Sequence, residues 1–430
     1  MTEKQGVCTL SWPGKDEARE LACSPSLCTM QADPERSIEF DYAQNLFVEG
    51  DNLDILKLLI PSFEGKVKMI YIDPPYNTGG NFVYSDRHNT TRGVSRKTEG
   101  SHHGWLSMMF PRLILARRLL RDDGVIFVSI DDNEVHHLRM MMSEVFGEEN
   151  FITTIVWEKK FSPQNDARWF SDNHDYILLF ARNKHEWRPR LLPRTAEADS
   201  RYKNPDNDLR GPWTSSDMSV KTYNVAYDYE ITTPSGRKVK PPTGRCWGMS
   251  KNSFNALIDD NRVWFGEKGR NVPRLKRFLS DVKQGITPRT IWKRNEVGDN
   301  QEARRHIREI FGDVGVFETP KPIRLIKRML HLCTEPDAND IVLDFFAGSS
   351  TTAHAVLELN QEDNGNRQFI MVQSPEEVPD DSRARVSGFR TVSEIGSERL
   401  RRVINSMKCE NKTPGRVVGF RYLVQVRGSH

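Results

Sequence analysis

Four residues of a kind that can hold an aromatic amine stand together in Asp73-Pro74-Pro75-Tyr76. They directly follow residues 67–72, an apolar run that predicts a buried strand. The two prolines fix φ and carry no N–H, so the carbonyl groups around them remain as hydrogen-bond acceptors. The carboxylate and the phenol ring would bind the N–H groups of a planar ring and stack on it. The alternative is a proline turn that only caps the strand.

A second stretch of this kind follows another predicted strand, at 341–344. Asp344 ends that strand, and Phe345-Phe346-Ala347-Gly348-Ser349-Ser350 leads to a helix predicted at about 350–359. Small residues let the backbone approach a ligand closely, and Ser can cap the helix. The spacing is not Gly-x-Gly-x-x-Gly, which argues against a dinucleotide. Gln373 follows the next predicted strand, where a Rossmann-type site has its ribose-binding acid.

Both stretches resemble motifs of the amino-methyltransferases that act on DNA bases. The first is similar to their signature Asp/Asn/Ser-Pro-Pro-Tyr/Phe. The second is similar to their cofactor motif Phe-x-Gly-x-Gly, with Ser350 at the last glycine, where a Cβ restricts positive φ. The catalytic motif precedes the cofactor motif, as in the β class of these enzymes. Longer runs at 70–79, 101–107 and 124–134 look like the modification subunits of type III restriction systems.

This resemblance implies a site-specific DNA methyltransferase. It would transfer a methyl group from S-adenosylmethionine to N6 of an adenine that has been extruded from duplex DNA. It implies catalysis by Asp73, Pro74, Pro75 and Tyr76. It implies cofactor binding by Asp344, Phe346, Ala347, Gly348, Ser349, Ser350, Asp51, Lys321, Gln373 and Asp73. Asp51 would lie at the cofactor adenine and Lys321 at the methionine pocket. For Asp51, Lys321 and Gln373 the alternative is a helix cap or a surface residue.

Two further pairs of residues could bind a metal ion. His102 and His103 have no third ligand near them in the sequence, and Asp131-Asp132 follow a predicted strand. Methyl transfer needs no metal, so we predict a solvated role for the histidines, and for the aspartates a helix cap or a contact to the cofactor region. No metal site is predicted.

The elements that must position these residues alternate along the chain. Residues 77–104 are predicted to form a long loop. Because strands alternate with helices, the fold class is α/β, a doubly wound, mostly parallel Rossmann-like sheet. It is circularly reordered, since the cofactor half comes last. Ligands of such sheets bind where strand order reverses, so the residues after 72, 130 and 343 should meet. Strands are predicted at 45–49, 67–72, 125–130, 151–157, 176–181, 341–344 and 368–373, and helices at 53–60, 105–121, 133–146, 321–332 and 350–359.

The alternation stops in the middle of the chain. Residues 181–300 contain 24 Lys+Arg and 14 Asp+Glu, although the net charge of the whole chain is only +3. A basic segment of this kind suits DNA phosphates, and a solvated basic face is the alternative. The predicted organisation is a loosely ordered arm at 1–40, a methyltransferase domain at 41–183 and 318–380, a target-recognition insert at 184–317, a C-terminal extension at 381–426 and a vector-derived tag remnant at 427–430.

The composition limits the other functions. No run approaches the 18 apolar residues of a membrane span, and the N-terminus does not have the pattern of a signal peptide. Six cysteines without paired spacing predict reduced thiols in a cytoplasmic, nucleoid-associated protein. The expected partner is double-stranded DNA, with a homodimer implied by resemblance and a restriction subunit as a further candidate. N4-cytosine methylation, a non-catalytic DNA-recognition subunit, and RNA or protein methylation remain alternatives.

Overall fold

A computed structural model describes residues 9–78, 102–163, 167–194, 196–282, 285–409 and 417–428. The predicted loop at 77–104 lies mostly outside this range. The chain divides into two compact units. Unit 1 comprises Met1–Arg190 and Arg289–His430, and unit 2 comprises Leu191–Pro288.

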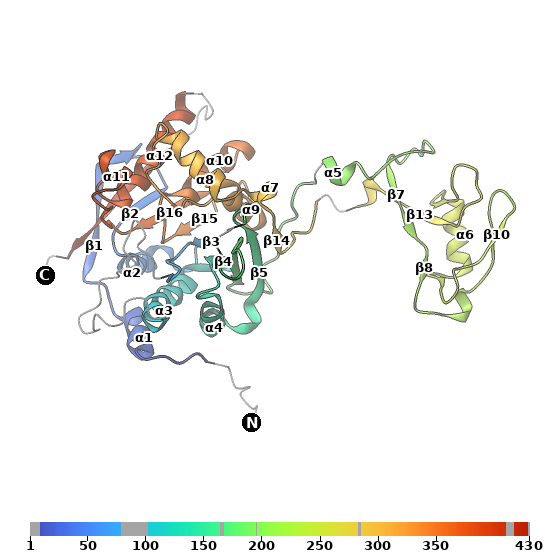
Figure 1. Ribbon diagram of the computed structural model, residues 1–430, viewed down its shortest axis with the longest axis horizontal. Helices are drawn as coiled ribbons and strands as arrows, with labels where there is room; N and C mark the ends of the chain where they lie inside the picture. Colours follow the sequence, from blue (N-terminus) through green and yellow to red (C-terminus); the bar gives the residue numbers. More distant parts are fainter. Residues whose placement is uncertain are drawn as a thin grey trace. The chain divides into compact units, whose positions relative to one another are not determined.

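Unit 1 is built on one mixed sheet (Figure 1). Within the described residues ten strands pair in the order β1-β17-β2-β16-β15-β3-β4-β6-β5-β14. The neighbours from β17 to β4 all run parallel, whereas β1 and β6 are antiparallel to their neighbours. The predicted doubly wound, mostly parallel sheet is confirmed. The strands are β1 (Cys28–Ile38), β2 (Leu46–Glu49), β3 (Val67–Ile72), β4 (Leu120–Ile130), β5 (Phe151–Glu158), β6 (His174–Ala181), β14 (Ile291–Trp292), β15 (Ile341–Asp344), β16 (Gln368–Gln373) and β17 (Phe420–Arg427).

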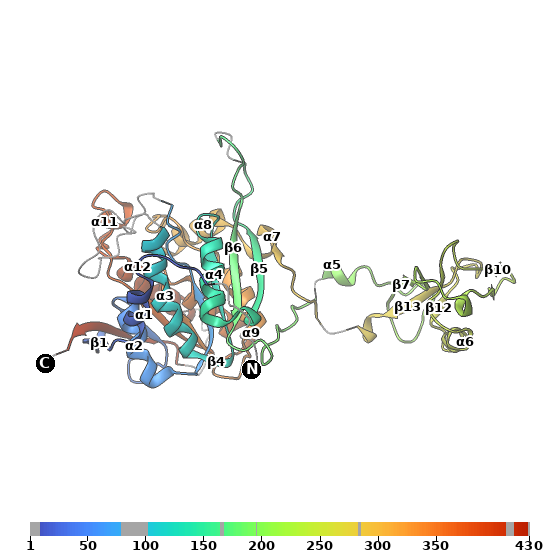
Figure 2. The same cartoon turned by 90° about the horizontal axis from the view of Figure 1, so that it is seen from below.

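Helices cover both faces of this sheet (Figures 1 and 2). The helices on one face, which pack on one another, are α1 (Lys15–Cys23), α2 (Asn52–Phe63), α3 (His102–Leu119) and α4 (Val135–Phe146). Those on the other face are α8 (Asn300–Ile310), α9 (Ile323–Cys333), α10 (Thr351–Asp363) and α12 (Val392–Cys409). Shorter helices are α7 (Arg294–Val297), α11 (Arg383–Val386) and the 3-10 turn Glu148–Asn150.

The strand order reverses between β3 and β15. From β3 the chain passes through α3 to β4 on one side, and from β15 it passes through α10 to β16 on the other. β3 and β15 are direct parallel neighbours, with Leu343 opposite Ile70. Their carboxyl ends therefore lie side by side, which is where a doubly wound sheet binds its ligands.

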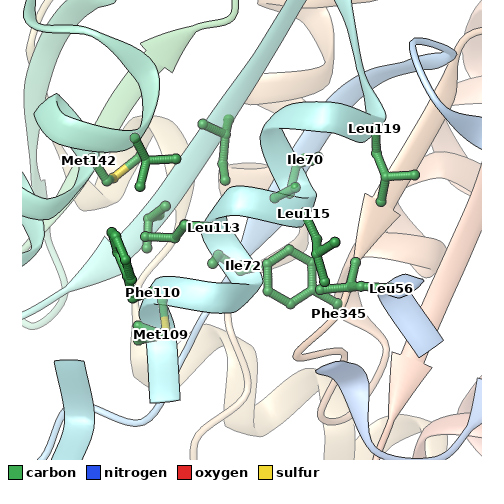
Figure 3. Packing of buried hydrophobic residues seen from close by; sticks show 14 of the residues in the cluster. Leu56, Ile70, Ile72, Met109, Phe110, Leu113, Leu115, Leu119, Met142 and Phe345 are labelled. Atoms are coloured by element: carbon green, nitrogen blue, oxygen red, sulfur yellow. The ribbon is translucent and has the colours of Figure 1, made fainter. Parts of the chain in front are cut away.

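A cluster of buried hydrophobic residues lies beneath this point (Figure 3). Met109, Phe110, Leu113 and Leu115 of α3 pack over β3, and all six residues of β3 are buried. Phe345, which follows β15, belongs to the same cluster. Each such side chain contributes about 1.5–3 kcal/mol on burial, so the strand ends rest on a well-packed base.

Unit 2 has a smaller core of its own. Its largest sheet has the order β12-β13-β7, and Trp247 and Phe254 are completely buried. Its elements are α5 (Ala196–Asp199), β7 (Trp213–Asp217), β8 (Ser219–Val220), the 3-10 turn Val225–Tyr227, β9 (Ile231–Thr232), β10 (Lys238–Val239), β11 (Cys246–Trp247), α6 (Lys251–Asp259), β12 (Val263–Trp264), β13 (Arg274–Phe278) and the 3-10 turn Leu279–Asp281.

Three predicted boundaries differ from the structure. Within the predicted arm, residues 9–40 are ordered, because Trp12 and Ala18 enter the core and β1 pairs with β17. The insert predicted at 184–317 is too wide, since 289–317 belong to unit 1, where β14 pairs with β5. The segment 381–426 adds α12 and most of β17, which ends at Arg427, to unit 1. These packing partners are distant in sequence, which local patterns do not reveal.

None of the helices described is long and apolar enough to cross a membrane.

Candidate active site at the ends of β3 and β15

The corner after β3 is held by side chains from other elements. The Asp73 carboxylate accepts hydrogen bonds from Tyr76 Oη at 2.9 Å and from Lys321 Nζ, which precedes α9. Trp105 Nε1 of α3 donates to the Pro75 carbonyl at 2.6 Å. The Asp73 side chain is 24% exposed. The predicted catalytic residues thus form one corner with a carboxylate that solvent reaches.

Tyr76 is a neutral hydrogen-bond donor at this corner. Burial, reinforced by the Asp73 carboxylate, raises its pKa well above the ordinary value of a phenol. The Lys321 ammonium lies 5.2 Å from the centroid of the Tyr76 ring. Lys321 therefore contacts both the carboxylate and the ring, rather than lying free on the surface.

Asp344 is almost completely buried at the end of β15. Its Oδ1 accepts from Phe346 N at 3.0 Å and its Oδ2 from Thr352 Oγ1 at 2.6 Å. Burial raises its pKa to about 7; Asp73 acts in the same direction and Lys321 opposes it. Since β3 and β15 are parallel neighbours, with Leu343 opposite Ile70, the two strand ends meet, as predicted.

The loop after Asp344 contains two residues with positive φ. Gly348 has φ 51°, and a Cβ there would lie 3.3 Å from the Phe317 ring. Ser350 has φ 59° and is completely buried. The serine therefore adopts the left-handed conformation that we expected its Cβ to restrict. Its Oγ has no hydrogen-bond partner among the described residues, and it lies so close to Gly396 that a Cβ there would come within 2.7 Å.

Two side chains brace this loop from beneath. Gly348 N donates to Gln373 Oε1 at 2.7 Å, so this oxygen is engaged with the loop. Arg399 of α12 is buried and its Nη1 donates to Ser349 O at 3.1 Å, Ser349 Oγ at 3.0 Å and Thr351 Oγ1 at 2.8 Å. Burial lowers the Arg399 pKa to about 9. Sequence analysis missed Arg399 because nothing in its surroundings marks it.

The start of α2 touches the same loop. Asn52 Nδ2 donates to Phe345 O at 2.8 Å, and the buried Arg112 donates through Nε to Asn52 Oδ1 at 2.5 Å. Asp51 caps α2, since its Oδ1 accepts from Leu53 N at 2.9 Å. Its side chain is still 48% exposed. The cap that we gave as the alternative is present, and the carboxylate remains accessible beside the loop. Phe346 is half-buried and Ala347 buried in that loop.

A second buried carboxylate lies next to the Asp73 corner. Asp175 of β6 accepts from Lys159 Nζ at 2.7 Å. Burial raises its pKa, and the Lys159 and Lys321 charges oppose that rise. Lys321 is therefore placed among three carboxylates, those of Asp73, Asp175 and Asp344.

The structure gives His102 neighbours of the ligating type that its surroundings in the sequence do not show. His102 Nδ1 lies 2.7 Å from Glu134 Oε1, and His137 Nδ1 lies 2.8 Å from Glu134 Oε2. These residues are 32 or more positions apart from His102, so spacing could not reveal them. Asp131 accepts from Asn133 N at 3.0 Å, just before α4, for which Glu134 is the N-cap residue.

The chain is similar to known DNA methylases over most of its length. The DNA methylase family N6_N4_Mtase matches residues 67–382. The Mod subunit of the type III restriction-modification enzyme StyLTI of Salmonella typhimurium is 37% identical over 95% of this chain and 65% of its own length. The EcoPI Mod subunit of Escherichia phage P1 is 32% identical over 96% and 71%. The type II methyltransferase M.KpnI of Klebsiella pneumoniae is 32% identical over 82% and 85%.

The type III relatives are longer proteins, and this chain spans about two thirds of their length. Among solved structures, the M1.HpyAVI–SAM complex has a TM-score of 0.35 at 14% identity, over 76% of this chain and 92% of that chain. This likeness is too distant to add to the family assignment.

Proposed function

The chain belongs to the DNA methylase family, and we propose that it transfers the methyl group of S-adenosylmethionine to N6 of an adenine extruded from duplex DNA. One observation carries the proposal: the Asp73 carboxylate and the loop after Asp344 lie together where strand order reverses. The acceptors that an amine needs thus stand beside a loop of the type that holds a nucleoside.

The residues present fit the cofactor. A solvent-accessible Asp51 carboxylate, a half-buried Phe346 ring and a loop with positive φ at Gly348 suit an adenosyl group. The cation Lys321 is paired with Asp73 and the cation Lys159 with Asp175, so the positive charges near the strand ends are already neutralised when a sulfonium binds. When bound, S-adenosylmethionine supplies an activated methyl group. We propose that the cofactor is held by residues of the loop and by four residues around it: Asp344, Phe346, Ala347, Gly348, Ser349 and Ser350, together with Asp51, Lys321, Gln373 and Asp73.

The chain's own residues position the amine. We assign to Asp73 and the carbonyl of Pro74 the two N–H groups of the target base, which favours a pyramidal nitrogen whose lone pair is free. Positive charge that develops on this nitrogen is stabilised by the Asp73 carboxylate. In the structure Lys321 and Tyr76 donate hydrogen bonds to that carboxylate. Binding of the amine would replace hydrogen bonds from these side chains by hydrogen bonds from the amine. Tyr76 stacks on the extruded base.

Unit 2 is the proposed target-recognition domain. It has a surface cleft of about 310 Å³ lined by Arg201, Lys203 and Arg274 together with Trp213 and Trp264. Cations and aromatic rings on one cleft suit phosphates and bases. We propose double-stranded DNA as the partner, a homodimer as the assembly, a restriction subunit as an optional second partner, and bacterial nucleoid DNA in the cytoplasm as the place of action.

Incubation of the full chain with tritiated S-adenosylmethionine and unmethylated bacterial DNA tests the activity. Nucleosides are then released and separated, and the label is expected in N6-methyladenosine of duplex DNA. Label in N4-methylcytosine would overturn the base assignment, and label in RNA or protein alone would overturn the substrate. No label on any DNA would favour the non-catalytic alternative.

A charge variant tests the role of unit 2. Replacing Arg201, Lys203 and Arg274 by Gln should weaken DNA binding and lower the slope of log affinity against log salt by roughly 3, about 1 per phosphate contact. The matched control replaces Lys240, Lys251 and Lys268 by Gln as well. These lysines are exposed in unit 2 and lie outside the cleft. An equal loss in both triple variants would show that general charge, rather than this cleft, binds DNA.

A further inference from the structure

We propose that His102, Glu134 and His137, with Asn77, form a binding site for a divalent transition-metal ion of the Zn²⁺ type. One ligating atom from each of the two histidines and the glutamate lies within 4.8 Å of the others. They come from the first turns of α3 and α4 and from the residue that caps α4. Imidazole and carboxylate ligands in this ratio are those of many zinc sites.

The geometry converges on one carboxylate. Both histidines present the same nitrogen, Nδ1, at 2.7 and 2.8 Å from the two oxygens of Glu134. The His102 and His137 rings lie 4.7 Å apart. Because a carboxylate only accepts hydrogen bonds, each Nδ1 carries the proton at these distances and donates it to Glu134. A metal ion would displace these two protons and bind the same nitrogen and oxygen atoms.

Within the described residues, Glu134 has no Lys or Arg partner. It is 0% exposed. Its contacts among these residues are the two imidazoles and the Asn77 amide. Buried charges in proteins are either paired or bound to metals. A metal ion would supply the missing positive charge.

A fourth ligand is at hand. Asn77 Nδ2 lies 2.7 Å from Glu134 Oε1. Rotation of the amide by half a turn brings its carbonyl oxygen to the same place, where it can bind the ion. The His102 side chain is 61% exposed, so water or solvent metal can reach the site. Three side chains plus an amide or a water complete a tetrahedral shell.

Another cluster of the same composition shows the contrast. His306, His354 and Glu358 also bring their ligating atoms within 4.8 Å. There, however, Lys327 Nζ donates to Glu358 at 3.3 Å and Arg399 Nε donates to His354 Nδ1 at 3.3 Å. Glu358 and His354 therefore already have cationic partners, which Glu134 does not have within the described residues, and that cluster serves as the negative control.

The site has a consequence for the corner after β3. Asn77 follows Tyr76 and has the left-handed φ of 57°. A bound ion would tie Asn77 to α3 and α4 and so fix the direction in which the chain leaves the corner. Any effect of the bound ion on methyl transfer, through the position of this corner, rests on the proposed function. Metal binding itself does not rest on it.

Equilibrium dialysis of the full chain against Zn²⁺, with the metal quantified in the protein compartment, tests the site. We expect saturable binding of one ion. His102→Ala and His137→Asn should each lower the affinity by about 100-fold, since even removal of a residue behind a ligand costs 10–100-fold. His306→Asn should leave the affinity unchanged. His102 is exposed, so its alanine variant is expected to fold, which circular dichroism checks.

Cobalt distinguishes this site from the thiols, of which Cys23 and Cys409 are exposed. Co²⁺ bound by nitrogen and oxygen gives visible ligand-field bands without thiolate charge-transfer absorption. These bands should vanish in Glu134→Gln and persist in the His306→Asn control. Absence of saturable binding to the wild type, unchanged affinity in both histidine variants, or a thiolate spectrum would each overturn the proposal and leave a purely hydrogen-bonded clamp.

Discussion

The two strand ends that meet at the active site are built in opposite ways. At β3, the donors to the Asp73 carboxylate are the ends of two long side chains, Tyr76 and Lys321, and solvent reaches the acid. At β15, Asp344 is bonded to a backbone N–H and to Thr352 and is 2% exposed. Arg399 holds the following loop from beneath.

This difference separates chemistry from preorganisation. Hydrogen bonds of a partly exposed carboxylate can be exchanged for those of a substrate amine at little net cost, because donors replace donors. Bonds made beneath a buried loop have no such replacement, and breaking them leaves acceptors unsatisfied. We therefore expect changes at the β3 corner to affect turnover and changes below the β15 loop to affect cofactor affinity.

The largest effect should come from Asp73→Ala. Loss of the carboxylate removes the acceptor for the amine and the charge that offsets the developing cation, so kcat should fall by about 10³-fold. Affinity for S-adenosylmethionine should change by no more than about threefold, since the braces of the loop are intact. Turnover is measured with tritiated cofactor and affinity by calorimetry.

Asp122→Ala is the control for this variant, because Asp122 is exposed near the start of β4, far from the carboxyl end of that strand. It should retain wild-type turnover. Near-normal turnover of Asp73→Ala would refute the role assigned to the β3 corner.

A smaller effect of the opposite kind is expected from Arg399→Met. The variant leaves Ser349 O, Ser349 Oγ and Thr351 Oγ1 without their donor, which should lower the free energy of unfolding by about 1–3 kcal/mol and weaken S-adenosylmethionine binding about tenfold. Turnover at saturating cofactor should stay close to wild type. Calorimetry and urea unfolding measure the two quantities.

The matched control is Arg402→Met, one turn further along α12 and partly exposed. If Arg399→Met instead lowered turnover at saturating cofactor and left affinity intact, the division between the two strand ends would fail.

Much of this active site could be predicted from local sequence. The strands at 67–72, 341–344 and 368–373 were predicted with their observed bounds, because continuous apolar runs report burial on both faces of a parallel sheet. The residues after such strands must then share one edge, which is why Asp73 and Asp344 could be expected to meet.

The remaining parts depend on contacts between distant residues. Arg399 looks like an ordinary basic residue of an amphipathic helix, yet it is buried under a loop about 50 positions earlier. Nothing in the sequence around Glu134 indicates that it contacts Asn77, His102 and His137. The pairing of β1 with β17 joins the two ends of unit 1. No periodicity encodes which remote partner a polar residue will find.

The smallest expected effect concerns the electrostatic coupling of the two strand ends. Burial raises the Asp344 pKa to about 7 from an ordinary value near 3.8. The folded protein therefore holds this proton more tightly than the unfolded chain, and the stability gained from it is present at low pH and lost as pH rises through about 7. Relative to Asp344→Asn, which cannot titrate, the wild type should lose roughly 1 kcal/mol or more between pH 5 and 8. Urea unfolding at both pH values measures this loss.

Because the Asp73 charge contributes to the raised pKa of Asp344, Asp73→Ala should move the loss to lower pH. Equal pH dependence in the wild type and Asp344→Asn would refute the raised pKa of Asp344. A loss at the same pH in the wild type and Asp73→Ala would show that the β15 acid is not coupled to the β3 corner.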